Sequence, residues 1–284
     1  MKIIEYIYQA LICSAMLGML SYLTIYALSE YQLHQVNMPP PFTYELKSDE
    51  GTINQGQHLL RTRGCFGCHG QQLEGRVKTD WDWVKQAIPP NLALFAKKHD
   101  ATVIERAIRH GIDHKERIMW TMPSYNFKHL SNEDVGAIIS YLIQAPVIDK
   151  ELPEPIMGLK ARWQLLTGEV EHMVDWLVRV PALSVDSAEN PDLARGEYLA
   201  MTTCNECHGF DLKGDQAVDF VTPDLTIMIK AYNEVDFRRL MQHGIGLGGR
   251  ENLGLMTVVA KDRFAFFTEQ ELTDLYIYLN TLGD

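Results

Sequence analysis

Apolar residues dominate one long segment near the N-terminus. Residues 7–28 are apolar apart from four uncharged polar residues, and a helix needs roughly 20 such residues to span a bilayer. The segment lacks the basic start, short apolar core and small-residue cleavage site that are typical of a cleaved signal peptide. The pattern predicts a retained transmembrane anchor over residues 1–30 and a polar, proline-bearing tether over residues 31–49; a buried core helix is the alternative.

Charge gives the anchor an orientation. Lys2 and the amino terminus are the only positive charges on its short side, so the positive-inside rule places the N-terminus in the cytoplasm. We therefore expect a single-pass membrane protein whose remaining residues lie outside the cytoplasm.

After the tether, apolar residues recur with the 3.6-residue period of helices. Two segments, each opening on Ser131 or Thr268 followed by acidic residues, have the N-cap and amphipathic pattern of a closing helix. Shorter periodic stretches cover residues 102–110 and 234–243. Nothing alternates with period two over a useful length, so the predicted fold class is all-α.

The periodic segments form an internal repeat, which predicts one domain used twice, over residues 50–146 and 191–284. The interval from proline to histidine is 20 residues in both copies, and that from Ser or Thr to tyrosine is 10. The matched positions are Gly56 and Gly196, Pro90 and Pro223, His110 and His243, Met122 and Met256, Ser131 and Thr268, and Tyr141 and Tyr278.

Residues 147–190, between the copies, contain several prolines and are predicted to be a linker. Within this linker, residues 159–180 are predicted to form a helix that is too apolar for a free tether. We expect that helix to pack on one or both domains or to enter the membrane surface.

Four of the five cysteines supply candidate chemistry. Cys65 with Cys68, and Cys204 with Cys207, form two C-x-x-C pairs, and a histidine follows each pair at once. C-x-x-C-H is the attachment signature of a c-type haem: both thiols form thioethers to the porphyrin and the histidine ligates the iron. A dithiol redox pair or half of a zinc site could share the C-x-x-C spacing.

Two such motifs predict two covalent haems c, with His69 and His208 as axial iron ligands. Methionine is the sixth ligand that gives an electron-transfer iron a high potential. Met122, 53 residues after His69, and Met256, 48 residues after His208, are the candidates.

Other residues could take these places. Met119 and Met241 are the rival methionines and are assigned to the core. Bis-histidine ligation would use His110 and His243, although their position before a glycine suits structural or solvent-exposed histidines.

Supporting groups are also predicted. Arg117 and Arg250 lie at nearly matching offsets before the candidate methionines and could bind haem propionates, because a guanidinium matches carboxylate geometry; ordinary surface arginines are the alternative. Each axial histidine needs an acceptor for its other ring nitrogen, and the carbonyl of a proline upstream of Asn91 or Asp224 is a candidate.

The formal charge of −11 is concentrated in residues 147–284. This acidic half argues against nucleic acid as a partner and favours a redox protein with a basic docking surface, unless it is merely a solvated acidic face.

With these motifs and closing helices, the chain resembles the class I cytochrome c family, and more closely the cytochrome c subunits of membrane-bound alcohol and gluconate dehydrogenases. The resemblance covers residues 50–284. It implies two small helical domains in which the opening helix crosses the closing helix over a haem, with Gly56 and Gly196 allowing close approach to Tyr141 and Tyr278. That family generally carries three haems and a cleaved leader, whereas here there are two motifs and a predicted anchor.

The expected function is electron transfer without independent catalysis, between redox partners such as a dehydrogenase, a quinol-oxidising complex or a terminal oxidase. The alternatives are a dihaem enzyme of the peroxidase or thiosulfate-oxidising type, which would need an iron with an open or unusual sixth position, and an assembly subunit with structural haems.

Overall fold

The computed structural model describes residues 2–79, 84–171, 173–214 and 221–282. In these ranges all regular elements are helices, accompanied by isolated β-bridges, so the all-α prediction is confirmed. The residues outside this description are Met1 of the predicted anchor, residues 80–83 of the first predicted domain, His172 of the predicted linker helix, and residues 215–220 and 283–284 of the second predicted domain. We call residues 50–146 the first repeat and residues 191–284 the second repeat.

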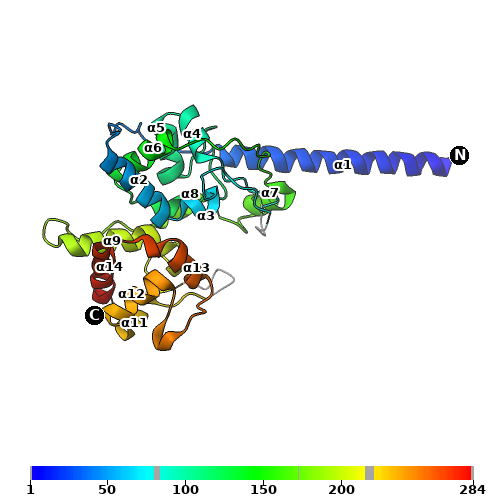
Figure 1. The fold of residues 1–284 in the computed structure, drawn as a ribbon. Helices are drawn as coiled ribbons and strands as arrows, with labels where there is room; N and C mark the ends of the chain where they lie inside the picture. The colour runs from blue at the N-terminus through cyan, green and yellow to red at the C-terminus, as the bar shows by residue number, and fades with distance from the viewer. Residues whose placement is uncertain (1, 80–83, 172, 215–220, 283–284) are drawn as a thin grey trace.

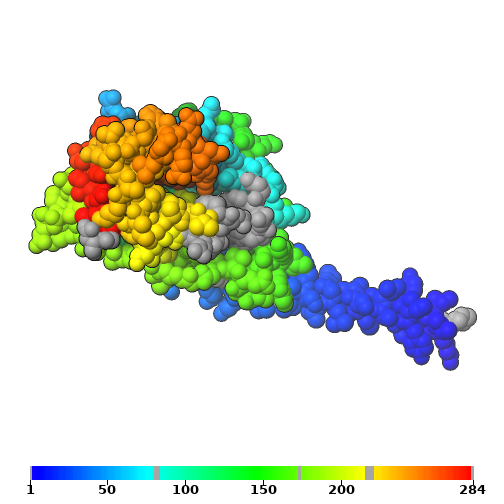
Figure 2. All heavy atoms as spheres, turned by 90° about the horizontal axis from the view of Figure 1, so that it is seen from below, coloured from blue at the N-terminus to red at the C-terminus, as the bar shows by residue number. Residues whose placement is uncertain are grey.

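Helix α1 (Lys2–Leu33) has 32 residues and is long and apolar enough to cross a membrane. It projects as a rod from the rest of the molecule, with the N-terminus at its far end (Figure 1). The view turned by 90° also shows the rod leaving the folded body at one end (Figure 2). Its side chains are mostly exposed, including that of Cys13.

The C-terminal end of α1 is fixed to the folded body. Leu33 is buried, and its carbonyl accepts a 2.8 Å hydrogen bond from the N–H of Ile118. The guanidinium of Arg162 donates to Ser29 Oγ and to Glu30 Oε1, both at 2.7 Å. The rod therefore leaves the body in a defined direction.

Residues 34–49, the greater part of the predicted tether, lie along the first repeat. Phe42 and Leu46 pack against its core, and the ring of Tyr44 lies so close to Gly136 that a Cβ there would come within 2.5 Å of the ring. This segment is a strap on the surface of the first repeat.

The first repeat is built around the crossing of its opening and closing helices. A Cβ at Gly56 would lie 2.1 Å from the carbonyl oxygen of Ala137 and 2.9 Å from Cβ of Tyr141, so only glycine allows this approach. Its helices are α2 (Glu50–Thr62), α3 (Cys65–His69), α4 (Leu92–Lys98), α5 (Ala101–Glu105), the π-helical turn η1 (Arg106–His110), the 3-10 turn η2 (Ser124–Phe127) and α6 (Asn132–Gln144).

The second repeat uses the same crossing. A Cβ at Gly196 would lie 2.2 Å from the carbonyl oxygen of Asp274 and 2.5 Å from Cβ of Tyr278, so both predicted close approaches are confirmed. Its elements are α9 (Pro191–Thr203), α10 (Asn205–His208), α11 (Leu225–Met228), α12 (Glu234–His243), α13 (Leu255–Asp262), α14 (Glu269–Thr281) and the 3-10 turns η3 (Ile229–Ala231), η4 (Leu247–Gly249) and η5 (Phe264–Phe266).

The closing helices begin as predicted. The Ser131 side chain accepts a hydrogen bond from the N–H of Asp134 at the start of α6. At the start of α14, Thr268 and Glu271 form a reciprocal capping box. Each cap satisfies backbone donors that the first helical turn leaves without partners.

The linker was predicted to contain one helix over residues 159–180, and the structure differs. It holds two helices, α7 (Gly158–Thr167) and α8 (Met173–Arg179), because Gly168 ends α7 in the left-handed conformation at φ 74°. Helix α7 packs along α1, and α8 packs near η2 of the first repeat. The prediction that the linker helix packs on one of the repeated domains is confirmed for α8.

The crossing of α2 and α6 generates a stability prediction. Gly56→Ala places a methyl group inside contact distance of the Ala137 carbonyl and should lower the free energy of unfolding by about 1–3 kcal/mol or more. Thermal or chemical unfolding of the intact protein measures the change. Gly51→Ala in the same helix is the control, because its nearest obstacle is the end of the Asp49 side chain at 3.2 Å; it should stay within about 1 kcal/mol of wild type. Equal effects of the two substitutions would contradict this packing account.

Candidate functional site

The first C-x-x-C-H motif occupies its own short helix, α3. Gly64 precedes this helix with φ 79° and Gly70 follows it with φ 90°, so the chain turns sharply at both ends. Cys65 and Cys68 are both free of disulfide bonds, and His69 is buried.

The second motif also ends in a short helix followed by a glycine, but Cys204 has right-handed helical backbone angles and directly continues α9, without a left-handed glycine before it. Cys204 is the residue at the start of α10, His208 is its last residue, and Gly209 follows with φ 78°. Cys204 and Cys207 are also free of disulfide bonds. Both motifs therefore present two free thiols and one imidazole from a tight helical turn.

Both motif histidines are oriented by the same type of hydrogen bond. His69 Nδ1 lies 2.9 Å from the carbonyl oxygen of Pro90, and His208 Nδ1 lies 2.9 Å from that of Pro223. The predicted proline acceptors are thus confirmed. A carbonyl can only accept, so each Nδ1 carries the proton and each Nε2 keeps its lone pair for a ligand bond.

Electrostatics favour the same protonation state. Burial lowers the pKa of His69 to about 4, against the opposing effect of the hydrogen bond to Pro90, and burial also lowers the pKa of His208. A neutral imidazole is the form that ligates a metal.

The loop after each motif repeats in detail. The N–H of Gly75 donates to the His69 carbonyl at 2.7 Å, and the N–H of Gly214 donates to the His208 carbonyl at 2.9 Å. Leu73 and Leu212 hold the corresponding left-handed position, at φ 61° and 59°. The carbonyl of Leu73 accepts a hydrogen bond from the N–H of Leu92, and the carbonyl of Leu212 accepts one from the N–H of Leu225. These bonds connect the turn after each proline to the loop that follows its motif.

Three of the four free thiols lack the lowered pKa of a reactive dithiol pair. Burial raises the pKa of Cys204 and of Cys207 to about 11, and burial likewise raises the pKa of Cys65. Reactive C-x-x-C pairs depend on a lowered thiol pKa, because the thiolate is the nucleophile. Burial therefore favours the protonated thiol at these three positions.

The candidate methionines lie against the two cores. Met122 is half-buried beside the core of the first repeat, and Met256, in the first turn of α13, is half-buried beside the core of the second. The rival Met241 is 3 % exposed inside the second core, which confirms its predicted role as a core residue. Met119 is half-buried.

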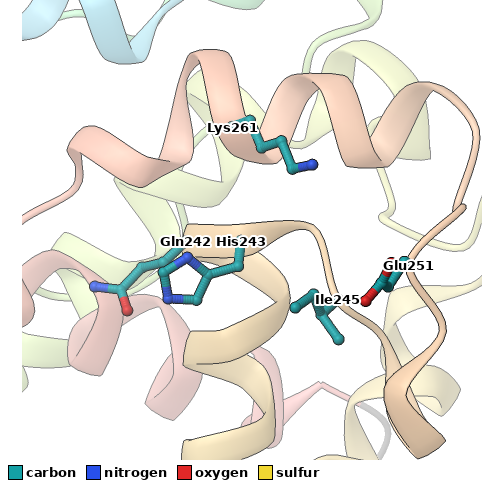
Figure 3. A pocket seen from close by; sticks show the side chains of 5 residues that line it. All are labelled: Gln242, His243, Ile245, Glu251 and Lys261. Carbon is teal, nitrogen blue, oxygen red and sulfur yellow. The ribbon is translucent and has the colours of Figure 1, made fainter.

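The rival histidines are engaged elsewhere or exposed. His110 Nε2 lies 3.0 Å from Glu105 Oε1, and the histidine side chain is 40 % exposed. His243 is exposed beside a surface cavity of about 360 Å³, where Figure 3 shows it with Gln242 at the end of α12 and Lys261 on the neighbouring helix. The interpretation of both as structural or exposed histidines is confirmed.

The two candidate propionate arginines have different surroundings. Arg117 donates to Asp113 Oδ2 at 3.0 and 3.1 Å, and its Nη1 lies 3.6 Å from Glu30 Oε2 near the end of α1. Arg250 is exposed in the loop before α13. Their propionate role stays a prediction.

Sequence reasoning missed several groups between the motifs. Arg63 is 4 % exposed, and Arg263 and Glu206 form an ion pair next to the first motif. Of these residues only Glu206 belongs to a C-x-x-C-H motif. It occupies one of the two positions that the motif leaves free, so the motif does not single it out. The arginines are indistinguishable from surface cations in the sequence.

Comparison with known proteins identifies the family. Residues 53–146 and 193–283 each match cytochrome c, and together these segments make up more than half of the chain. The chain belongs to the cytochrome c family. It is also 24 % identical over 276 residues to the gluconate 2-dehydrogenase cytochrome c subunit of Pantoea cypripedii. That match covers 84 % of this chain and 61 % of the relative, so the chain spans about three fifths of the relative's length.

Membership of the cytochrome c family implies covalently bound haem c, and the residues fit this group. Cys65 and Cys68, or Cys204 and Cys207, would form the thioethers, and the neighbouring histidine offers an unprotonated Nε2 to the iron. When bound, a haem supplies a one-electron couple. The protein holds the imidazole in one tautomer, and Cys65 and Cys204 lie against the apolar cores of their repeats.

The assignment of Met122 gives a spectroscopic prediction. Met122→Leu should remove the far-red absorption band of methionine-ligated ferric haem that the first repeat would contribute, because leucine has no sulfur to ligate iron. Met119→Leu is the matched control and should keep the band. Both spectra are recorded on oxidised protein with unchanged haem content. If Met119→Leu loses the band and Met122→Leu keeps it, the assignment is wrong.

Proposed function

We propose that this cytochrome is a membrane-anchored dihaem protein that passes electrons one at a time from a dehydrogenase to a further carrier of a respiratory chain. The haem domains lie at the periplasmic face of a bacterial cytoplasmic membrane. One haem is attached at Cys65 and Cys68, with His69 and Met122 as axial ligands. The other is attached at Cys204 and Cys207, with His208 and Met256.

The observation that carries this proposal is the duplicated attachment geometry. Each repeat offers two free thiols and an imidazole whose Nδ1 is fixed by a proline carbonyl. Such second-sphere hydrogen bonds set ligand orientation and raise ligand basicity, which suits a coordinatively saturated electron-transfer iron. The candidate methionine beside each core supports a sixth ligand, and a filled sixth position leaves no site for substrate at the iron.

The membrane location rests on α1. Its length suits a bilayer. Its C-terminal end is fixed to the folded body by the burial of Leu33 and by the ion pair between Glu30 and Arg162. An anchor with a fixed exit direction confines the haem domains to a plane, so partner encounter becomes a two-dimensional search. This supports a fixed subunit or close partner of a membrane complex over a freely diffusing carrier.

The dehydrogenase partner is suggested by the relative from Pantoea cypripedii, which is the cytochrome c subunit of gluconate 2-dehydrogenase. The acidic second half of the chain suits a partner with a basic docking surface. Association should then weaken as ionic strength rises.

The test is purification of the full chain from its native membranes in mild detergent at low salt. We expect a dehydrogenase to co-purify and its substrate to reduce both haems, and we expect high salt to dissociate the pair. The control is the same preparation without the dehydrogenase substrate, which should stay oxidised. Turnover of peroxide or thiosulfate by the purified chain, with no reduction by any co-purified protein, would favour the enzymatic alternative and overturn the proposal.

A further inference from the structure

Arg263 of the second repeat lies against Gly64, next to the first C-x-x-C-H motif, and pairs with Glu206 inside the second motif. In Figure 1, α2 and α3 of the first repeat face α9 and α13 of the second. One residue of the second repeat, Arg263, touches both motif regions. Arg263 follows the last residue of α13 and precedes η5, whose Phe264 is buried in the second core.

The guanidinium of Arg263 lies directly on the turn that precedes the first motif. A Cβ at Gly64 would come within 2.2 Å of both Cζ and Nε of Arg263. The absence of a side chain at Gly64 is therefore what allows a residue of the second repeat to sit next to Cys65. Gly64 also adopts φ 79°, which favours glycine at this position independently.

The same guanidinium binds the second motif. Arg263 Nη1 donates to Glu206 Oε2 at 2.9 Å, and Glu206 lies between Cys204 and Cys207. Both side chains are about a quarter exposed, at 22 % and 28 %, so solvent screens this pair only partly. Burial lowers the pKa of Arg263, but the charge and hydrogen bond of Glu206 outweigh it and the net shift is upward. Arg263 is a permanent cation here.

Neighbouring contacts close the interface around this ion pair. His58 Nε2 of α2 lies 2.9 Å from Glu271 Oε1 of α14. Arg61 is placed between two aromatic rings, 4.0 Å from the centroid of Phe66 and 5.0 Å from that of Phe266. The interface thus joins the first motif helix to the segment that carries Arg263.

We propose that Arg263 is a positioning residue that clamps the Gly64–Cys65 turn of the first repeat to Glu206 of the second, and so fixes the two haem-attachment motifs relative to each other. This inference rests on the proposed dihaem function. The clamp also has an electrical role. A cation next to a haem edge stabilises the reduced iron, a carboxylate stabilises the oxidised iron, and the ion pair keeps these effects balanced.

The electron transfer proposed between the two repeats moves one electron and changes no covalent bond. One electron leaves a ferrous haem and enters the ferric haem of the other repeat, and no bond forms or breaks. Transfer between two bound haems would depend on a constant separation, which the Arg263 contacts would help to maintain by holding the two attachment motifs in place.

Three single substitutions and one double variant of the full-length haem-containing protein test the clamp. Arg263→Gln should lower the midpoint potentials of the haems, because it leaves the Glu206 carboxylate unpaired. Glu206→Gln should shift them upward, and the double variant should return near to wild type. Arg263→Lys should keep the potential close to wild type, because the charge is retained, but should loosen the interface, because an ammonium cannot both cover Gly64 and reach Glu206.

Hydrogen–deuterium exchange of residues 61–66 measures the interface separately from the potentials. Arg263→Gln and Arg263→Lys should both lose amide protection there. Arg239→Gln is the matched control, since Arg239 pairs with Asp236 inside the second repeat, and it should change neither the exchange nor the potentials.

Two failures are distinguishable. A purified chain that lacks two haems refutes the proposed function itself. A chain with two haems in which the Arg263 variants match Arg239→Gln in exchange and in both midpoint potentials refutes the clamp alone.

Discussion

The hydrogen bond from each motif histidine to a proline carbonyl is the contact on which the rest of the structure depends. It fixes the tautomer, turns Nε2 toward a ligand and connects the motif helix to the loop that begins the next helix. Asn91 and Asp224, directly after the prolines, cap α4 and α11. One dipeptide in each repeat therefore orients the imidazole and starts a helix. The same arrangement in both repeats explains how one small fold serves two sites.

Local features of this fold were predictable from the sequence because each depends on residues that are close in the chain. The C-x-x-C-H spacing, the caps at Ser131 and Thr268 and the proline acceptors are of this kind, and the structure contains all the predicted caps and acceptors. The close approaches at Gly56 and Gly196 were predictable from the family resemblance. A side chain at either position would collide with the backbone of the closing helix, so only glycine lets the two helices cross there.

Features that depend on tertiary packing were not predictable. The linker was expected to be one helix, but Gly168 ends α7 because its left-handed conformation suits a C-cap, a choice that periodicity alone does not reveal. The predicted tether packs through Phe42 and Leu46, two isolated apolar residues in a polar segment. Arg263 has no local pattern at all, since its partners are Gly64, nearly 200 residues earlier, and Glu206.

The central claim is that two haems are bound through sulfur at the Cys65/Cys68 and Cys204/Cys207 pairs. Intact-mass measurement of the purified, denatured chain tests it most directly, because thioether bonds survive denaturation whereas axial ligation does not. The account predicts the mass of the polypeptide plus two haem groups, with one haem found on a proteolytic peptide from each repeat. A mass equal to that of the bare polypeptide would contradict it.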